Sequence, residues 1–225
     1  MSRSHHARGG IGVRGPVPGW ESRAVNREMR VQPADDPALR QVGELFEGYA
    51  GSWWVAGGWA VDLNLGRVTR AHGDVDVQVL ARELELFVGH SGAYELQLAD
   101  RLTGERRAWA YPEPVEPGRE TLLLVGGPVA LEVMVARSDG DEWVFHRGHR
   151  TRLPLGRLTR RTADGLPYLA PEVVLLFKAR GTRPKDEEDF RALAPLLGPE
   201  QRSWLAERLT PPGTGPHPWR EALEA

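Results

Sequence analysis

Two aspartates separated by one residue, Asp74 and Asp76, are the side chains in this sequence best suited to chemistry. They belong to residues 74–80 (DVDVQVL), where polar and apolar residues alternate with the period of a β-strand. Both carboxylates are therefore expected on one face of the strand, about 6.6 Å apart along it. Two carboxylates at that spacing repel each other unless a cation lies between them, and oxygen ligands with open positions suit Mg²⁺ shared with substrate phosphates. Strands with this pattern also occur on solvated sheet faces.

A glycine pair, Gly57-Gly58, stands between a short apolar segment (residues 53–56), predicted to be a buried strand, and a short helix (residues 59–65) that ends at Gly66. Backbone N–H groups at such a helix start can face an anion such as a phosphate. A Gly-Gly pair alone most often marks a turn. Here the aspartate pair follows on the next predicted strand, with three valines on its reverse face. Together these features favour a metal–phosphate site.

The chain has 225 residues, with 29 Lys and Arg against 31 Asp and Glu, and it has no cysteine. The lack of cysteine excludes disulfides, thiolate zinc sites and a cysteine nucleophile. The net charge of −2 excludes a globally basic nucleic-acid-binding protein. No apolar stretch reaches the ~20 residues that span a bilayer, and residues 1–33 do not resemble a secretory signal. We expect a cytoplasmic protein with no membrane partner.

The patterns along the chain predict an α+β arrangement. Apolar residues recur with helical spacing over residues 37–49, with Asp36 as the expected N-cap. Several β-type segments follow between residues 74 and 169, and three further helices are predicted to begin at Pro171, Pro184 and Pro199. We divide the chain into a disordered basic tail (1–33), a core (34–150), a β-hairpin with a helical cap (151–210) and a flexible C-terminal tail (211–225).

The central stretch resembles the signature of the DNA polymerase beta-like nucleotidyltransferase superfamily, in which a Gly-Gly turn precedes an Asp-x-Asp strand. More narrowly, it is similar to the antibiotic nucleotidyltransferases, which are the aminoglycoside 2''-adenylyltransferase family and the related lincosamide nucleotidyltransferases. The residues that carry this resemblance are Gly57–Asp62 (GGWAVD), Leu65–Arg67 (LGR), Thr69-Arg70, His72, Asp74–Asp76 (DVD), Pro171–Lys178 and Arg183–Phe190. The resemblance covers about residues 35–197. It implies a nucleotidyltransferase fold, with a mixed sheet, flanking helices and a C-terminal helical cap.

The same resemblance implies Mg²⁺-dependent transfer of a nucleoside monophosphate, AMP from ATP, to a hydroxyl of a small molecule. Gly57 and Gly58 would approach the triphosphate of the nucleotide. Asp74 and Asp76 would be catalytic metal ligands, holding the Mg²⁺ that bridges the phosphates. A third carboxylate in this family comes from a neighbouring strand, where it binds metal or accepts the proton of the attacking hydroxyl.

Glu132 is our candidate for that third catalytic and metal-binding carboxylate, because it is the single charge in the apolar segment 130–135 (ALEVMV). The alternative is an edge-strand residue that faces water. Lys178 is a lone cation in an apolar helix. It would reach the triphosphate if the family's arrangement holds, or else extend harmlessly to solvent. Arg70 and His72 would either contact phosphate or make structural hydrogen bonds to their loop.

Other charged residues near the motifs have simpler expected roles. Asp62 is expected to hold Arg67 or Arg70 in place rather than to touch substrate. The start of the helix after Pro184 supplies charges that we assign to helix-start electrostatics and inter-helix pairing, namely Lys185, Asp186 and Asp189.

The sequence carries little information about which compound accepts the nucleotide. A polycationic aminoglycoside would need several carboxylates, for which Glu113, Glu116 and Glu120 are available; a lincosamide would prefer an aromatic wall, for which the candidates are Trp53, Trp54, Trp109 and Trp143. Two alternatives stay open. One is a toxin-type nucleotidyltransferase acting on RNA or protein, which predicts a basic groove beside Asp74. The other is a catalytically silent nucleotide-binding regulatory protein.

Overall fold

The computed structural model describes residues 32–92, 94–145, 151–181, 183–209, 215 and 217–224. Residues 1–31 of the predicted tail lie outside the described residues. Pro33, the last residue of that predicted tail, begins the 3₁₀ turn η1 (Pro33–Asp35). The described helices are α1 (Pro37–Leu45), α2 (Gly57–Leu65), α3 (Leu84–His90), α4 (Leu155–Leu158), α5 (Pro171–Lys178), α6 (Pro184–Leu193), α7 (Pro199–Arg208) and α8 (Pro218–Glu224), with 3₁₀ turns η2 (Ala81–Glu83) and η3 (Ala194–Leu196). The described strands are β1 (Trp53–Val55), β2 (Val75–Leu80), β3 (Glu95–Asp100), β4 (Arg106–Ala108), β5 (Glu120–Val125), β6 (Leu131–Asp139), β7 (Glu142–Phe145), β8 (Thr151–Pro154), β9 (Thr159–Arg161) and β10 (Pro167–Leu169).

These strands form one mixed sheet in the order β4-β3-β5-β6-β2-β1-β10-β9, and β7 pairs with the far end of β6 and with β8. The pairs β2–β6 and β1–β10 are parallel, whereas β1–β2 and β5–β6 are antiparallel. The predicted boundary at residues 150 and 151 does not divide this sheet, because β9 and β10 join it next to β1. Strand β8 was not predicted, since its four residues carry a weak pattern of their own.

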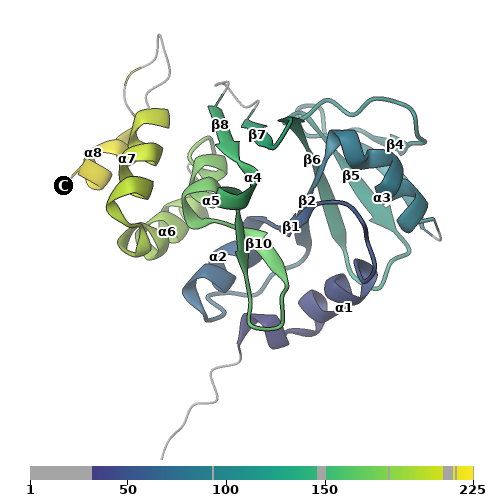
Figure 1. Ribbon diagram of the computed structural model, residues 1–225, viewed down its shortest axis with the longest axis horizontal. Helices are drawn as coiled ribbons and strands as arrows, with labels where there is room; N and C mark the ends of the chain where they lie inside the picture. The colour runs from purple at the N-terminus through teal and green to yellow at the C-terminus, as the bar shows by residue number, and fades with distance from the viewer. Residues whose placement is uncertain are drawn as a thin grey trace, which may run out of the picture. The chain divides into compact units, whose positions relative to one another are not determined.

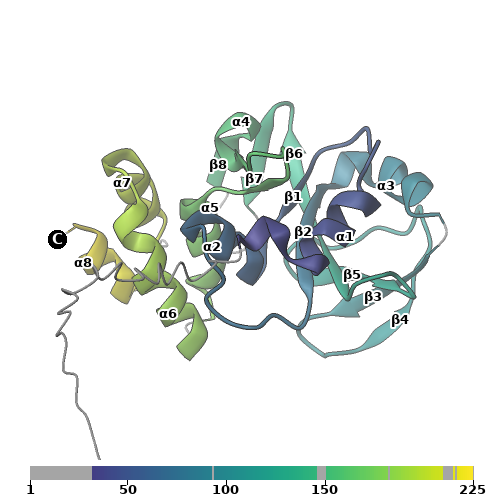
Figure 2. The same ribbon diagram turned by 90° about the horizontal axis from the view of Figure 1, so that it is seen from below.

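Two hydrophobic clusters lie on opposite sides of the sheet. The first packs one face against α1 and α3, through residues such as Leu39, Val42 and Phe87. The second packs the other face against α2, α5 and the C-terminal helices, with Val174 and Leu205 among its members. Figures 1 and 2 show α6, α7 and α8 gathered at one end, with α2 and α5 between them and the strands.

Local signals set the bounds of the helices near the motifs. Asp36 caps α1 as predicted, because its carboxylate accepts a hydrogen bond of 2.9 Å from the Ala38 N–H. The helix ends at Leu45 rather than at residue 49, in a turn where Gly48 has a φ of 73°. Helix α2 begins at Gly57, two residues earlier than predicted. Its predicted left-handed end at Gly66 is confirmed, with a φ of 65°.

The C-terminal segment differs from the predicted flexible tail, because part of it forms α8. Trp219 is 2% exposed, its ring stacks on Phe190 at 4.4 Å between centroids, and its indole N–H donates to Glu187 at 2.9 Å. One buried tryptophan removes enough apolar surface from water to order a short helix that its Pro- and Gly-rich surroundings conceal. Among the described helices, none has the length and apolar character needed to cross a membrane.

Candidate active site

The predicted carboxylates line one cleft of about 970 Å³. Asp76 on β2 and Glu132 on β6 are aligned as Cα partners on neighbouring parallel strands. Asp74 immediately precedes β2 and is exposed at the mouth of the same cleft. Because β6 lies between β5 and β2, the edge-strand alternative for Glu132 is wrong.

The three carboxylates do not form a ready-made cage for a metal ion. Glu132 Oε2 accepts a hydrogen bond of 3.0 Å from Arg101 Nη2, which turns it toward the β3–β4 turn. Within the part of the chain that the structure describes, no group of three or more acidic or histidine side chains is arranged to hold a metal by itself. This arrangement still fits Mg²⁺, which proteins commonly bind through one or two carboxylates together with substrate phosphates and water.

Asp76 is the most perturbed of these acids. Burial raises the pKa of its carboxyl to about 6, and the nearby negative charge of Glu132 adds to the increase. Arg101 and Lys178 act in the opposite direction without cancelling it. A desolvated carboxylate with an acidic neighbour is a position where a divalent cation would be favourable.

Both glycines of the pair are required by close approach of side chains. Gly57 has a φ of 60°, and a Cβ atom there would lie 2.7 Å from Cγ of Asp76. A Cβ on Gly58 would lie 2.6 Å from Cε1 of His72. The regular hydrogen bonds of α2 begin with the Ala60 N–H donating to the Ala56 carbonyl at 3.1 Å, so the preceding amides have no partner within the helix. The start of α2 therefore presents backbone N–H groups beside the carboxylates, as an anion site requires.

Asp62 holds the loop that leads to Asp74, but not through the predicted arginines. Its buried carboxylate accepts hydrogen bonds from the Thr69 N–H at 3.1 Å and from His72 Nε2 at 2.6 Å. Arg67 reaches only the Asp62 backbone carbonyl, so the expected side-chain contact with Arg67 or Arg70 is wrong. Burial alone would raise the pKa of Asp62, but the hydrogen bonds from His72 and Thr69 outweigh it and lower that pKa.

His72 is also fixed on its other side. Arg70 Nη1 lies 3.3 Å from His72 Nδ1, and an arginine can only donate there. Nε2 then carries the proton that His72 donates to Asp62. The Trp59 ring packs on the imidazole at 4.3 Å between centroids, and its indole N–H donates to the Asp74 carbonyl at 3.1 Å. These contacts position the residue that precedes β2.

Lys178 does not extend to solvent. Its side chain is 8% exposed, and its ammonium lies 2.6 Å from Asp189 and 3.6 Å from Asp186 on α6. Arg70 Nη2 donates to the same Asp189 carboxylate at 3.2 Å. The expected inter-helix pairing of Asp186 and Asp189 is therefore present, and these two acids hold cations at the cleft wall. Lys185 also lines the cleft.

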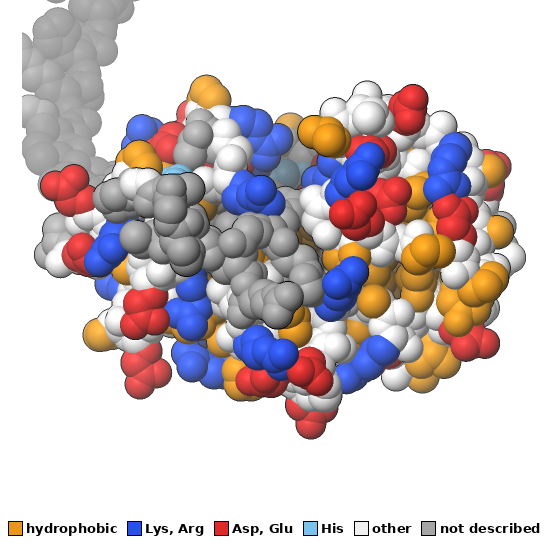
Figure 3. Space-filling model, turned by 90° about the horizontal axis from the view of Figure 1, so that it is seen from above, with side chains coloured by type: hydrophobic (Ala, Val, Ile, Leu, Met, Phe, Trp, Pro, Cys, Tyr) orange, Lys and Arg blue, Asp and Glu red, His pale blue; other side chains and the backbone are white. Residues whose placement is uncertain are grey.

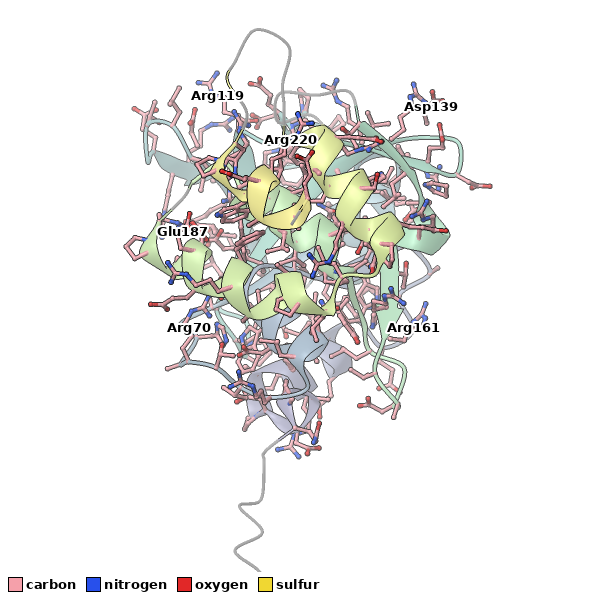
Figure 4. The ribbon with its side chains drawn as sticks, turned by 90° about the vertical axis from the view of Figure 1, so that its left-hand side faces the viewer. Arg70, Arg119, Asp139, Arg161, Glu187 and Arg220 are labelled. Atoms are coloured by element: carbon pink, nitrogen blue, oxygen red, sulfur yellow. The ribbon has the colours of Figure 1, made fainter. Side chains whose placement is uncertain are left out.

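Cations surround the carboxylates on several sides. The cleft is lined by Arg70, Arg101, Arg119, Lys178, Arg180, Arg183 and Lys185. Figure 3 shows Lys and Arg side chains interspersed with Asp and Glu on one face of the molecule, and Figure 4 shows Arg119 and Arg70 above one another along the left edge of its view. Such a lining suits a polyphosphate, whose charge several cations can share. Neither Arg101 nor Arg119 was singled out from the sequence, because nothing in their neighbourhood marks them as close to β6.

The predicted acceptor residues are only partly at the cleft. Glu116 lines it, whereas Glu113 pairs with Arg107 and Glu120 accepts a hydrogen bond from the Glu116 N–H at 2.6 Å. The four candidate tryptophans do not line the cleft. They belong to the packed interior, apart from Trp53, which is half-buried and stacks on Phe46.

A mixed sheet that places strand-borne carboxylates beside a Gly-Gly helix start defines the class of nucleotidyltransferase folds. Two structures of ANT(2'') enzymes share this fold. The structure of ANT(2")-Ia in complex with adenylyl-2"-tobramycin matches with a TM-score of 0.52 at 15% identity, over 76% of this chain and 94% of that one. The solution structure of antibiotic-resistance factor ANT(2'')-Ia matches with a TM-score of 0.51 at 15% identity, over 75% and 86%. Comparison with curated proteins by sequence gave no match.

Residues 38–90 match the model of the aminoglycoside-2''-adenylyltransferase family. The resemblance predicted from the sequence is therefore confirmed for this segment, and the predicted fold class is confirmed by the structural matches. The matched segment contains the glycine pair and both aspartates, whereas Glu132 and Lys178 lie beyond it. A lincomycin-bound structure of the lincosamide adenylyltransferase LnuA also matches, at 18% identity and a TM-score of 0.49, over 71% of this chain and 96% of that one.

Proposed function

We propose that this protein is a Mg²⁺-dependent nucleotidyltransferase that moves AMP from ATP to a hydroxyl of a small molecule. One observation carries the proposal. Two carboxylates on adjacent parallel strands, a third acid beside them and the amide-bearing start of α2 all meet in a single cleft lined by cations. The matched family segment supports the same chemistry.

Asp74 and Asp76 would hold the Mg²⁺, with Glu132 as a further ligand or as the base. Bound Mg²⁺ would neutralise part of the negative charge on the phosphates of the nucleotide. The amides of Gly57 and Gly58, together with Arg70 and Lys178, would bind the triphosphate, and His72 keeps Arg70 in position. These groups orient the nucleotide and balance its charge, which supplies most of the acceleration in phosphoryl transfer.

The transfer step is a displacement at the α-phosphorus of ATP. The acceptor oxygen forms a bond to that phosphorus, the bond to the bridging oxygen of the β-phosphate breaks, and pyrophosphate leaves with the electron pair. We assign the proton of the attacking hydroxyl to the Glu132 carboxylate, one oxygen of which pairs with Arg101 in the free protein. If that pair breaks when the nucleotide binds, Arg101 can contact a phosphate.

The first acceptors to test are aminoglycosides, since one structure that shares the fold holds an adenylylated tobramycin, and the lincosamides that the resemblance in sequence suggests. A role in antibiotic resistance would follow only if such a compound is the natural acceptor. A cytoplasmic location fits the use of ATP. The decisive assay measures pyrophosphate release with Mg²⁺, each of four nucleoside triphosphates, and a panel of both antibiotic classes. Release that needs a hydroxyl acceptor and prefers ATP supports the proposal, and the absence of release with every nucleotide and acceptor contradicts it.

The toxin-type alternative predicted a basic groove, and the cationic lining of the cleft favours it in part. Most of these cations, however, already pair with acids, as in Arg101–Glu132, Arg119–Asp100 and Arg183–Asp186. A groove that tracks a nucleic-acid backbone needs cations in excess of acids. Labelled ATP incubated with total RNA distinguishes the two functions, because only the toxin-type enzyme would label the RNA.

A further inference from the structure

A second hollow adjoins the catalytic cleft. Strands β2 and β6 align Gln78 with Met134, two positions past the Asp76–Glu132 pair. Side chains on one face of a strand repeat every two residues, so Gln78 lies on the cleft side about 6.6 Å beyond Asp76. Helix α2 begins next to Asp76, where the Ala56 N–H donates to the Asp76 carbonyl. Gln78 is therefore on the side of the carboxylates that lies away from α2.

The hollow measures about 20 Å³, enough for one water-sized group. Its walls include Gln78, Met134, Trp143, Phe145 and Phe177. Met134 and Phe177 also line the catalytic cleft, as do two residues of the loop before β5. The hollow therefore shares part of its lining with the cleft.

Two residues that line this hollow, Gln78 and Trp143, each carry a buried polar atom without a partner in the described part of the chain. Gln78 is 2% exposed and Trp143 is 1% exposed. Gln78 Oε1 and Trp143 Nε1 have no hydrogen-bond partner among the described residues. Buried polar groups in folded proteins are nearly always paired, because leaving one unpaired is costly. Glu120 also lines the hollow, and its carboxylate accepts from the Glu116 N–H.

The two atoms together select a hydroxyl. Gln78 Oε1 accepts a hydrogen bond and the Trp143 indole N–H donates one, so their shared partner must both donate and accept. An ammonium can only donate and a carboxylate can only accept. Glu120 supplies a charge to the lining and accepts from the Glu116 N–H, whereas Met134, Phe145 and Phe177 make the rest of the wall apolar, where burial of a charge is unfavourable. A hydroxyl is uncharged and contributes one heavy atom, which suits the volume.

We propose that Gln78 and Trp143 form a specificity subsite that binds an uncharged hydroxyl group of the acceptor. The inference rests on the proposed function, because in-line displacement puts the acceptor opposite the leaving pyrophosphate. The triphosphate faces the start of α2, so the acceptor enters from the side on which Gln78 lies. The acceptor class is then an uncharged polyhydroxyl compound rather than a polycation.

Two substitutions test the subsite. Gln78→Met removes the acceptor atom at nearly constant size, and Trp143→Phe removes the donor together with part of the ring. Pyrophosphate release is measured with saturating Mg²⁺ and ATP against a panel of uncharged glycosides and polyols, with tobramycin as the polycationic comparison. We expect each variant to raise the KM for the best uncharged acceptor about tenfold, with the KM for ATP unchanged.

Stability separates a binding role from a structural one. Gln78→Met removes an unpaired buried polar atom at nearly constant volume, so its unfolding midpoint in urea should stay equal to or exceed that of the wild type. Trp143→Phe also leaves a cavity, so it should lose some stability, but less than a variant that in addition breaks a hydrogen bond. The matched control is Trp54→Phe, since the Trp54 indole is buried and donates to Thr159 Oγ1 at 2.6 Å, outside the hollow. This control should lose stability and keep both KM values.

Several results would overturn the subsite. They are a tobramycin KM below that of every uncharged compound, no transfer to any uncharged compound, or an unchanged acceptor KM in Gln78→Met and Trp143→Phe. Failure of the proposed function looks different, because the wild type would then release no pyrophosphate with any acceptor. Release by the wild type that both variants retain rejects the subsite alone.

Discussion

Asp76 on β2 and Glu132 on β6 lie opposite each other on adjacent parallel strands, with their Cα positions in register. Neighbouring strands are about 4.8 Å apart, so the two carboxyl groups share one face of the sheet at close range. Arg101 pairs with Glu132 and leaves Asp76 desolvated beside a negative charge. In the free protein the two carboxylates repel each other, and a cation bound beside them would relieve that repulsion.

Removing the charge of Asp76 should stabilise the metal-free protein. The pKa of this group rises from 3.8 to about 6 on folding. The destabilisation of the folded state by the charge of this carboxyl is therefore absent below pH 3.8, grows as the pH rises toward 6 and is complete above pH 6. Asp76→Asn should raise the free energy of unfolding by up to about 3 kcal/mol at pH 7.5 and by about half as much at pH 5. Urea unfolding in EDTA measures both.

Asp139→Asn is the matched control for that change, because Asp139 is exposed and its ion pair among the described residues is with Arg152 at the surface. Its effect should stay below about 1 kcal/mol at both pH values. A stability loss of equal size for Asp76→Asn at pH 5 and pH 7.5 would contradict the predicted pH dependence.

Gly57→Ala should damage both the fold and the site. The new Cβ would meet the Asp76 carboxylate, and Gly57 already has a φ of 60°. Gly140→Ala is the control, since Gly140 has a φ of 55° and a Cβ added there would meet no described atom within 4 Å beyond its chain neighbours. Gly140→Ala should lose about 1–2 kcal/mol from backbone strain alone. Gly57→Ala should lose more and also bind Mg²⁺ together with ATP more weakly, measured by calorimetry; equal losses in both variants would refute the clash.

Asp62→Asn should loosen the loop that precedes Asp74. The lowered pKa of Asp62 means that its charge stabilises the fold above pH 3.8, and that this contribution is lost as the pH falls through the lowered value. The variant should lose about 1–3 kcal/mol at pH 7, with a deficit that shrinks only below pH 3.8. Thr69→Val, which keeps the His72 contact, should lose less. A deficit that already disappears at pH 5 would contradict a lowered pKa for Asp62, and a deficit that does not change with pH would mean that its charge is unimportant.

Lys178→Met tests the assignment of Lys178 to the triphosphate. The change leaves the buried Asp189 with Arg70 as its remaining cation, so stability should fall by about 3 kcal/mol or more. The Kd for ATP should rise as well. Lys185→Met is the control, because Lys185 is exposed on the same cleft wall and should change stability little. An unchanged ATP Kd in folded Lys178→Met would remove Lys178 from the nucleotide site.

The local parts of the site were readable from the sequence. The alternation of polar and apolar residues predicts the Asp-x-Asp strand, and the Gly-Gly pair lies between a predicted strand and a predicted helix. Glu132 is recognisable as the single charge in an apolar strand. Glu132 comes close to the aspartates because β6 pairs in parallel with β2. Three strands lie between β2 and β6 in the sequence, and no local pattern predicts that the two are neighbours.

The long-range charge pairs could not be predicted from the sequence. Asp62 was expected to hold an arginine, yet it pairs with His72, because loop geometry rather than charge decides which donor reaches it. Arg101 meets Glu132 across 31 positions of sequence. Lys178 was expected to reach either phosphate or solvent, and the acids of α6 that hold it became visible only once α5 and α6 were packed together.

The most direct measurement is pyrophosphate release from ATP and Mg²⁺, with an acceptor taken from the panel, by the wild type, Asp74→Asn and Asp139→Asn. Asp74 is exposed, so its substitution should leave the urea midpoint unchanged. We expect the wild type and Asp139→Asn to release pyrophosphate at equal rates, and Asp74→Asn to release it at least about a hundredfold more slowly. An Asp74→Asn variant that works at the rate of the wild type would contradict a metal-binding role for the aspartate pair.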